Sequence, residues 1–124
     1  MRRPRFGALL GLGLAALLSG CATTKSPALY YWGGYNEQVY TSMQRQDADP
    51  ARQIADMEAE VERARSSGKS LPPGFQAHLA YLYSQHGQAD AAVEKLEAEK
   101  AQFPESATYM DRLIATLRGP KVTQ

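Results

Sequence analysis

The chain has 124 residues and a formal net charge of +1, and 44% of its residues are hydrophobic while 22% are charged. This length accommodates one small domain. Because nucleic-acid binding depends on clustered lysines and arginines, a nearly neutral chain argues against a nucleic-acid partner. Cys21 is the single cysteine, which excludes a disulfide within the chain.

The amino terminus has the layout of a secretory signal. Residues 1–5 carry three arginines and no acid, and Phe6–Leu18 is an uncharged stretch of 13 residues rich in Leu, Ala and Gly. A membrane-spanning helix needs about 20 apolar residues, so this stretch is too short to span a bilayer. The following Leu18-Ser19-Gly20-Cys21 resembles the lipobox of bacterial lipoproteins, in which the cysteine receives a diacylglyceryl group and the signal is cut before it. We expect residues 1–20 to be a lipoprotein signal peptide that is removed; the alternative is an ordinary signal peptide beside a chance cysteine.

A lipid on Cys21 would determine where the protein works. Two or more acyl chains anchor a protein to a membrane for practical purposes permanently. Ala22 follows the cysteine, and the resemblance implies outer-membrane sorting, because an aspartate at this position tends to retain a lipoprotein in the inner membrane. We therefore expect an outer-membrane lipoprotein that faces the periplasm. The composition predicts a flexible tether at 21–28, which the lipobox resemblance implies is lipidated, a helical domain at 29–118 and a disordered tail at 119–124.

Aromatic residues are dense in the segment from Leu29 to Asn36, which also contains Gly33-Gly34. These rings could form a membrane-interface belt or a partner-binding surface. They could instead fold back as a cap on a helical core, with the glycines permitting close approach. A short helix is predicted from about Asn36 to Gln46, since apolar residues continue at helical spacing. With two later tyrosines, the candidate partner-binding residues are Tyr30, Tyr31, Trp32, Tyr35, Tyr81 and Tyr83.

A longer helix is predicted from Asp49-Pro50 to about Ser66. Asp49 can accept a hydrogen bond from the first turn, and proline suits the first helical position. Four acidic residues in this helix suggest a metal site, but alternating positions point around a helix and do not converge. We therefore expect no metal there. The acids are Asp56, Glu58, Glu60 and Glu62, and the predicted buried stripe is Ile54, Met57, Val61 and Ala64.

The pattern after Gly74 resembles a tetratricopeptide repeat, a helix–turn–helix unit of 34 residues. The residues that carry it are Leu79, Ala80, Tyr83, Gly87, Ala92, Leu96 and Pro104. Small residues at two of these positions let the helices approach, the glycine turns the chain and the proline ends the second helix. Glu99 departs from the pattern, which usually has a small residue there.

Two helices complete the expected fold. The second helix of the repeat is predicted from about Ala89 to Phe103, with Ala89 among its buried residues. Ser106 is expected to cap a last helix that ends near Leu117. Its apolar stripe is either a docking face or a cover for the open end of the repeat; it consists of Tyr109, Met110, Leu113, Ile114 and Leu117. The prediction is an all-α bundle of about five helices with one tetratricopeptide-like helix-turn-helix.

The sequence contains no recognisable catalytic arrangement. His78 and His86 lie about two helical turns apart, so they cannot hold one ion without help, and no H-E-x-x-H motif is present. Gly33-Gly34 lacks the lysine and the preceding strand of a phosphate-binding loop. We therefore expect no catalytic residues, no cofactor and no metal, and we expect that the protein is not an enzyme.

Several segments together carry a wider resemblance. They are Tyr31–Tyr35 with Val39-Tyr40, Pro72–Gly74 with Ala77–Leu79 and Tyr81–Tyr83, and Glu99-Lys100 with Phe103–Ser106 and Met110–Leu113. The combination is similar to an uncharacterised family of short proteobacterial lipoproteins that is classified only as a domain of unknown function. Such proteins are often encoded beside a lipoprotein resembling the curli-secretion pore and a second small lipoprotein. The resemblance thus implies a shared outer-membrane assembly.

Two functions are consistent with these observations. The first is an outer-membrane-anchored interaction module that assembles with another envelope lipoprotein, such as the one resembling the curli-secretion pore. The second is a small periplasmic carrier or sensor that binds a hydrophobic or cell-wall ligand through an aromatic groove at Tyr30, Trp32, Tyr81 and Tyr83.

Overall fold

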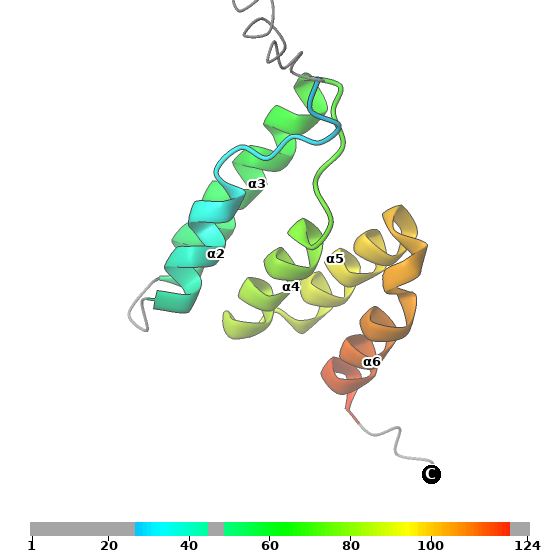
Figure 1. Cartoon of the computed structure of the whole chain (residues 1–124). Helices are drawn as coiled ribbons and strands as arrows, with labels where there is room; N and C mark the ends of the chain where they lie inside the picture. Colours follow the sequence, from blue (N-terminus) through cyan, green and yellow to red (C-terminus); the bar gives the residue numbers. More distant parts are fainter. Residues whose placement is uncertain (1–26, 45–48, 120–124) are drawn as a thin grey trace, which may run out of the picture.

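The computed structural model describes residues 27–44 and 49–119 (Figure 1). These residues form α2 (Tyr35–Gln44), α3 (Pro50–Ser66), α4 (Phe75–Gln85), α5 (Ala89–Gln102), the short 3-10 helix η2 (Pro104–Ser106) and α6 (Ala107–Arg118). No strand occurs in the described part of the chain, so the predicted all-α fold is confirmed. The signal peptide, Cys21, most of the tether and residues 120–124 lie outside the described residues.

The helix boundaries agree closely with the sequence. The Asp49 carboxylate accepts a hydrogen bond from the Ala51 amide at 3.0 Å, and α3 ends at Ser66 as predicted. The first described helix begins at Tyr35, one residue earlier than expected, and its described part ends at Gln44. The predicted side-chain cap at Ser106 is wrong, because the Ser106 hydroxyl donates to the Phe103 carbonyl oxygen at 2.7 Å.

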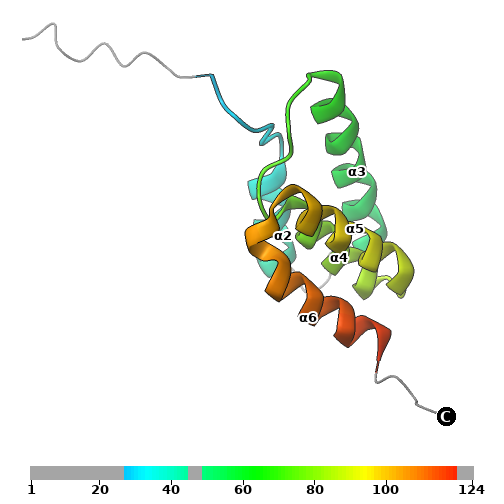
Figure 2. The ribbon, with the colours of Figure 1, turned by 90° about the vertical axis from the view of Figure 1, so that its right-hand side faces the viewer.

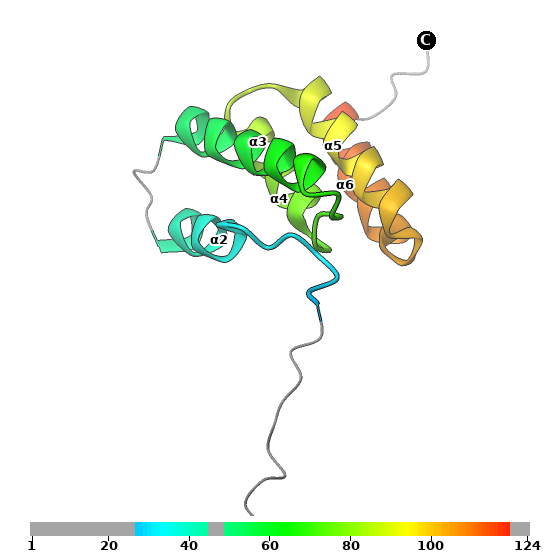
Figure 3. The same ribbon diagram turned by 90° about the horizontal axis from the view of Figure 1, so that it is seen from above.

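The helices pack mainly against their neighbours in sequence. α2 and α3 run antiparallel, and α3 also packs on α4 (Figure 3). The most extensive contact is between α4 and α5, and α6 then packs on α5 (Figure 2). Sequential packing of this kind is typical of helical repeat proteins, in which each unit contacts only its neighbours.

The pair α4–α5 is the predicted tetratricopeptide-like hairpin. Ala80 is 2% exposed and Ala92 is fully buried where the two helices meet. Gly87 has a φ of 76°, a left-handed conformation that glycine adopts without steric cost, and it turns the chain between the helices. Pro104 follows the end of α5, as expected. The prediction that Ala89 is buried is wrong, because this residue is exposed at the start of α5.

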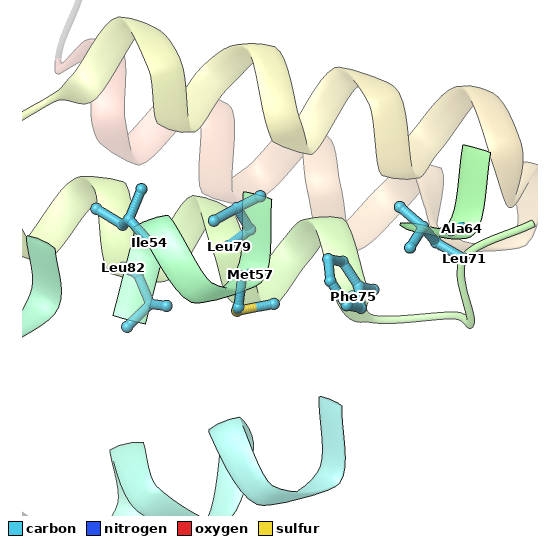
Figure 4. Packing of buried hydrophobic residues seen from close by; sticks show 7 residues of the cluster. All are labelled: Ile54, Met57, Ala64, Leu71, Phe75, Leu79 and Leu82. Atoms are coloured by element: carbon cyan, nitrogen blue, oxygen red, sulfur yellow. The ribbon is translucent and has the colours of Figure 1, made fainter. Parts of the chain in front are cut away.

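Two hydrophobic clusters form the core. The first joins α3 and α4 (Figure 4) and contains Ile54, Met57, Ala64, Leu71, Phe75, Leu79 and Leu82. The second joins α4, α5 and α6 and contains Ala80, Ala92, Leu96, Met110 and Ile114. Tyr83 packs against both clusters, so α4 connects the two halves of the core.

The hydrogen bonds of Glu99 explain why this position departs from the repeat pattern. Its side chain extends from α5 to the start of α4, where one carboxylate oxygen accepts from the Gly74 amide at 2.6 Å and the other from the Gln76 amide at 3.1 Å. Glu99 is only 3% exposed. A carboxylate at this point satisfies amides that have no partner within the helix and complements the helix dipole. The residue therefore caps α4 from a neighbouring helix, and α6 still packs on α5.

Candidate docking groove

A groove of about 400 Å³ lies over α4, between α2 and α6. Figure 1 shows α4 between these two helices. Among the described residues, six large hydrophobic side chains are exposed, and Met43, Tyr81 and Tyr109 of these line the groove. The lining consists of Tyr35, Val39 and Met43 from α2, Ala77, His78, Ala80, Tyr81 and Ser84 from α4, Leu96 from α5, and Tyr109, Leu113, Thr116 and Leu117 from α6.

The groove has a floor of mostly small residues and walls of large ones. Ala77, Ala80 and Ser84 of α4 contribute little side-chain volume at the floor. The walls carry side chains at helical spacing, every fourth residue on α2 and every third or fourth on α6. The lining residues form one stripe on each of α2, α4 and α6. Each stripe spans seven or eight residue steps, which at 1.5 Å per residue is a length of about 12 Å.

No lining residue is an Asp, Glu, Lys or Arg. The polar centre is His78, whose Nε2 lies 3.1 Å from the Ser42 hydroxyl. Ser42 is also 2.7 Å from Oε1 of Gln53, a residue that is 6% exposed. Burial lowers the pKa of His78 below its usual 6.5, which favours the neutral imidazole. The groove is therefore apolar and uncharged.

Two of the six predicted partner-binding residues line this groove. The Tyr35 ring lies 5.2 Å from the Phe75 ring, which ties α2 to the first hydrophobic cluster. Burial, and then the charge of Glu99, raise the pKa of the Tyr35 phenol. Tyr81 is 49% exposed, and its ring stacks on His78 at 5.9 Å. Both rings thus line the groove.

Three other predicted residues lie in the segment before α2, and two of them, Tyr30 and Tyr31, pack against the core. The Tyr31 amide donates to the Ser70 carbonyl oxygen at 2.8 Å, and the Tyr30 ring meets Phe103 edge-on at 6.1 Å. Trp32 remains 45% exposed beside Tyr35. This arrangement supports the interpretation of the aromatic segment as a cap that folds back on the core.

Gly33 makes this cap possible. Its φ is +42°, and a Cβ atom there would collide with the Glu60 carboxylate and lie 2.7 Å from the Tyr31 ring. The Glu60 carboxylate, first as a hydrogen-bond acceptor, and then burial raise the pKa of the Tyr31 phenol. The predicted close approach at the glycines is confirmed.

Tyr83 points away from the groove and connects three helices. Its hydroxyl donates to Glu58 of α3 at 2.8 Å, and the same carboxylate oxygen pairs with Lys95 of α5 at 2.7 Å. The Lys95 ammonium lies 5.9 Å from the centre of the Tyr83 ring. Burial and then the hydrogen bond to Glu58 raise the pKa of Tyr83 to about 12. The structure therefore separates Tyr83 from Tyr81, although the two are close in sequence.

The sequence predicts an apolar stripe on α6 and apolar residues at helical spacing on α2, but not the groove that the two helices enclose. Helical spacing indicates both stripes, but it does not show which members remain exposed. On α6, Met110 and Ile114 cover the end of the repeat, whereas Tyr109, Leu113 and Leu117 turn toward the groove. The α6 stripe thus covers the open end of the repeat, as one of the two interpretations predicts, and three of its residues also line the groove.

Within residues 27–44 and 49–119, no helix combines the length and the apolar character needed to cross a membrane. The same ranges hold no group of three or more His, Cys, Asp and Glu side chains placed to bind a metal ion. Glu58 interacts with Tyr83 and Lys95, whereas Glu60 pairs with Arg63.

Comparison with known proteins places the chain in a family. No curated protein and no solved structure matches it. A family model, described as Domain of unknown function (DUF4810), matches residues 29–113. This match covers more than half of the chain and nearly the whole of the predicted helical domain. The chain therefore belongs to this family of unknown function.

Proposed function

We propose that the protein is an outer-membrane lipoprotein, anchored through Cys21 and facing the periplasm, that docks another envelope protein. It acts by binding and carries no catalytic site. The partner is an envelope lipoprotein, and the one resembling the curli-secretion pore is the first candidate. The observation that carries the proposal is the uncharged groove between α2 and α6.

The distribution of exposed side chains supports docking at this groove. Monomeric proteins rarely expose a large apolar patch without a binding role. Here three large hydrophobic side chains surround one groove. The outward face of α6 is polar by contrast, with Asp111, Arg112 and Arg118 exposed. A polar outer face is what a terminal helix of a repeat array needs to remain soluble.

The anchor would assist docking by confinement. The tether from Cys21 to the first described residues is at most about 25 Å long when extended, so the domain would stay close to the membrane. Two proteins held on one surface meet at a high effective concentration, and a weak pairwise affinity then suffices. A groove of modest size is compatible with such a role.

A second candidate is a carrier or sensor of a hydrophobic or cell-wall ligand. The groove volume of about 400 Å³ favours it, because small-molecule sites commonly measure about 300–1,000 Å³. Of the four residues first considered for such a ligand, Tyr81 lines the groove, while Tyr30, Trp32 and Tyr83 lie elsewhere.

Extraction of the tagged, full-length protein from envelopes in mild detergent tests the docking proposal. We expect the lipoprotein resembling the curli-secretion pore to co-purify, and mass spectrometry to find a lipid on Cys21. A Cys21→Ser variant, which cannot be lipidated, should capture less partner. A lone monomer, under conditions that preserve other envelope complexes, would contradict docking; an unmodified thiol with an intact amino terminus would contradict the anchor.

A further inference from the structure

We infer that the domain makes a second membrane contact beside its lipid anchor, in which the exposed side chains of Leu29, Trp32 and Tyr40 rest in the interfacial layer of the phospholipid bilayer. The inference rests on the anchor at Cys21 in the proposed function and goes beyond it. A tether alone leaves the orientation of the domain on the membrane free, whereas a second contact fixes that orientation.

The large hydrophobic side chains that are exposed among the described residues fall into two groups of three. One group lines the groove. The other group lies outside the groove, in the segment that follows the tether, and consists of Leu29 (82% exposed), Trp32 (45%) and Tyr40 (65%). Tyr40 belongs to α2, a helix that buries none of its residues. A partner bound in the groove would therefore leave this second group uncovered.

The segment that carries this second group is almost uncharged. Residues 27–44 contain one charged side chain, Glu37, whereas the 17 residues of α3 contain seven. A charged group loses hydration when it enters the boundary between water and lipid, and this loss is costly without a partner. Indole and phenol rings are instead enriched at that boundary, because each combines an apolar body with a polar edge. The segment thus has the composition of a membrane-facing surface.

The position of the segment suits contact with the membrane that holds the anchor. Cys21 precedes Pro27, the first described residue, by six positions, so the two are at most about 20 Å apart. Residues 27–34 and α2 lie along one side of the molecule (Figure 3), and α4 lies between α2 and α5 (Figures 1 and 3). A bilayer beside this segment leaves the exposed charges of α5, Asp90 and Glu94, in water.

The anchor also favours the bilayer over a protein as the cover of this surface. Once Cys21 is lipidated, the bilayer is always within reach of the segment, and a protein would have to displace it. The contact itself can be weak, because the acyl chains already confine the domain to the membrane surface.

Trp32 is the single tryptophan of the chain, so its fluorescence reports on this surface alone. The test uses the lipidated protein in phosphatidylcholine vesicles whose acyl chains carry bromine, a quencher of tryptophan, either near the headgroup or near the bilayer centre. We expect bromine near the headgroup to quench Trp32 strongly and bromine near the centre to quench it weakly, because the ring lies at the interface.

A matched control moves the tryptophan to the other side of the domain. Trp32→Phe combined with Glu94→Trp places it at an exposed position of α5, where neither kind of vesicle should quench it.

Two substitutions test the surface around Trp32. Tyr40→Asp and Leu29→Asp each introduce a charge into the contact and should reduce the quenching of Trp32 by bromine near the headgroup. Tyr40→Phe keeps the ring and should retain the quenching. All three variants change exposed side chains, so circular dichroism should give the wild-type helix content for each.

Several outcomes would overturn the inference. They are absence of quenching at Trp32, equal quenching of the control tryptophan on α5, and quenching that Tyr40→Asp and Leu29→Asp leave unchanged. A dimer in detergent that Tyr40→Asp dissociates would assign the surface to a second copy of the chain. Shielding of Trp32 from a soluble quencher only in the presence of an envelope partner would assign it to that partner.

The proposed function is judged by separate measurements. If the partner co-purifies and Cys21 carries lipid but Trp32 is not quenched, docking and the anchor stand and the membrane contact falls. If Trp32 is quenched as expected and no partner co-purifies, docking falls and the membrane contact stands. An unmodified Cys21 would overturn both the anchor and the membrane contact.

Discussion

Glu99 is the residue whose role is most specific. Its buried carboxylate accepts hydrogen bonds from the Gly74 and Gln76 amides. Removing a charged acceptor from buried donors costs about 1.5–3 kcal/mol or more. We expect Glu99→Ala to lower the free energy of unfolding by about 2–4 kcal/mol, measured by urea denaturation.

Glu97 provides the control for this prediction. Its carboxylate pairs with Lys100 at 2.8 Å on the surface of the same helix. Exposed ion pairs contribute about 0–1 kcal/mol, so Glu97→Ala should have a small effect. Equal losses of stability in the two variants would show that Glu99 does not cap α4.

His78 should make stability depend on pH. Its half-buried ring lies between Tyr35 at 6.3 Å and Tyr81 at 5.9 Å, and burial lowers its pKa below 6.5. The folded state therefore binds fewer protons than the unfolded state at mildly acidic pH. The contribution of His78 is complete above about pH 6.5 and is lost as the pH falls through its folded-state pKa.

Urea midpoints measured between about pH 7.5 and pH 5 would test this dependence. The carboxylates add an acid dependence of their own, so the comparison is between variants. His78→Gln should flatten the curve, whereas His86→Gln, at an exposed position at the end of α4, should retain the wild-type shape. A wild-type slope in His78→Gln would locate the titrating group elsewhere.

The sequence predicts residues with local roles better than those with distant partners. Gly87 and Pro104 act on the backbone at their own positions, so the repeat pattern was sufficient to predict the turn and the helix end. Glu99 meets its partner amide 25 positions away in sequence. Helical spacing places such a residue on a face, but it does not reveal which amides that face meets.

At the scale of elements, α2 is the helix with the weakest attachment. None of its residues is buried. It is held by the Tyr35 ring against Phe75 and by Ser42 beside Gln53 and His78. Local opening is easiest where few buried apolar contacts are lost. We expect the amides of α2 to exchange with solvent faster than those of α4 in native-state hydrogen exchange.

Tyr35→Ala should accelerate exchange in α2 further and leave α5 unaffected, because the substituted contact lies outside the second hydrophobic cluster. If α2 instead proves as protected as α4, it opens only with the whole domain. The groove would then have two fixed walls, α2 and α6, rather than one that can adjust to an occupant.

The walls of the groove illustrate what an amphipathic pattern leaves undetermined. The spacing of Tyr35, Val39 and Met43 predicts one apolar face on α2, and the structure contains that face. Its burial depends on what other helices place opposite it. Here that neighbour is the small-residue surface of α4, which leaves a groove in place of a packed contact. The sequence alone therefore predicts the apolar face of α2, but it does not predict that this face lines a groove.

At the scale of the molecule, the two hydrophobic clusters share α4, and α6 completes the second one. Met110 and Ile114 of α6 are each 4% exposed. Burying such a side chain contributes about 1.5–3 kcal/mol, and a domain of this size has a total stability of only about 5–15 kcal/mol. Loss of α6 also uncovers Ala80, Ala92 and Leu96.

A chain that ends at Ser106 should consequently lose cooperative thermal unfolding and bind a hydrophobic dye, as domains do when an apolar core face meets water. Its control is full-length Arg112→Ala, which alters the exposed face of α6 and leaves the core contacts in place. Circular dichroism melts of the two proteins decide the matter. A truncated chain with the cooperativity and midpoint of the control would mean that α6 only rests on a repeat that is stable without it. The wall that α6 gives the groove would then be a separable attachment rather than part of the core.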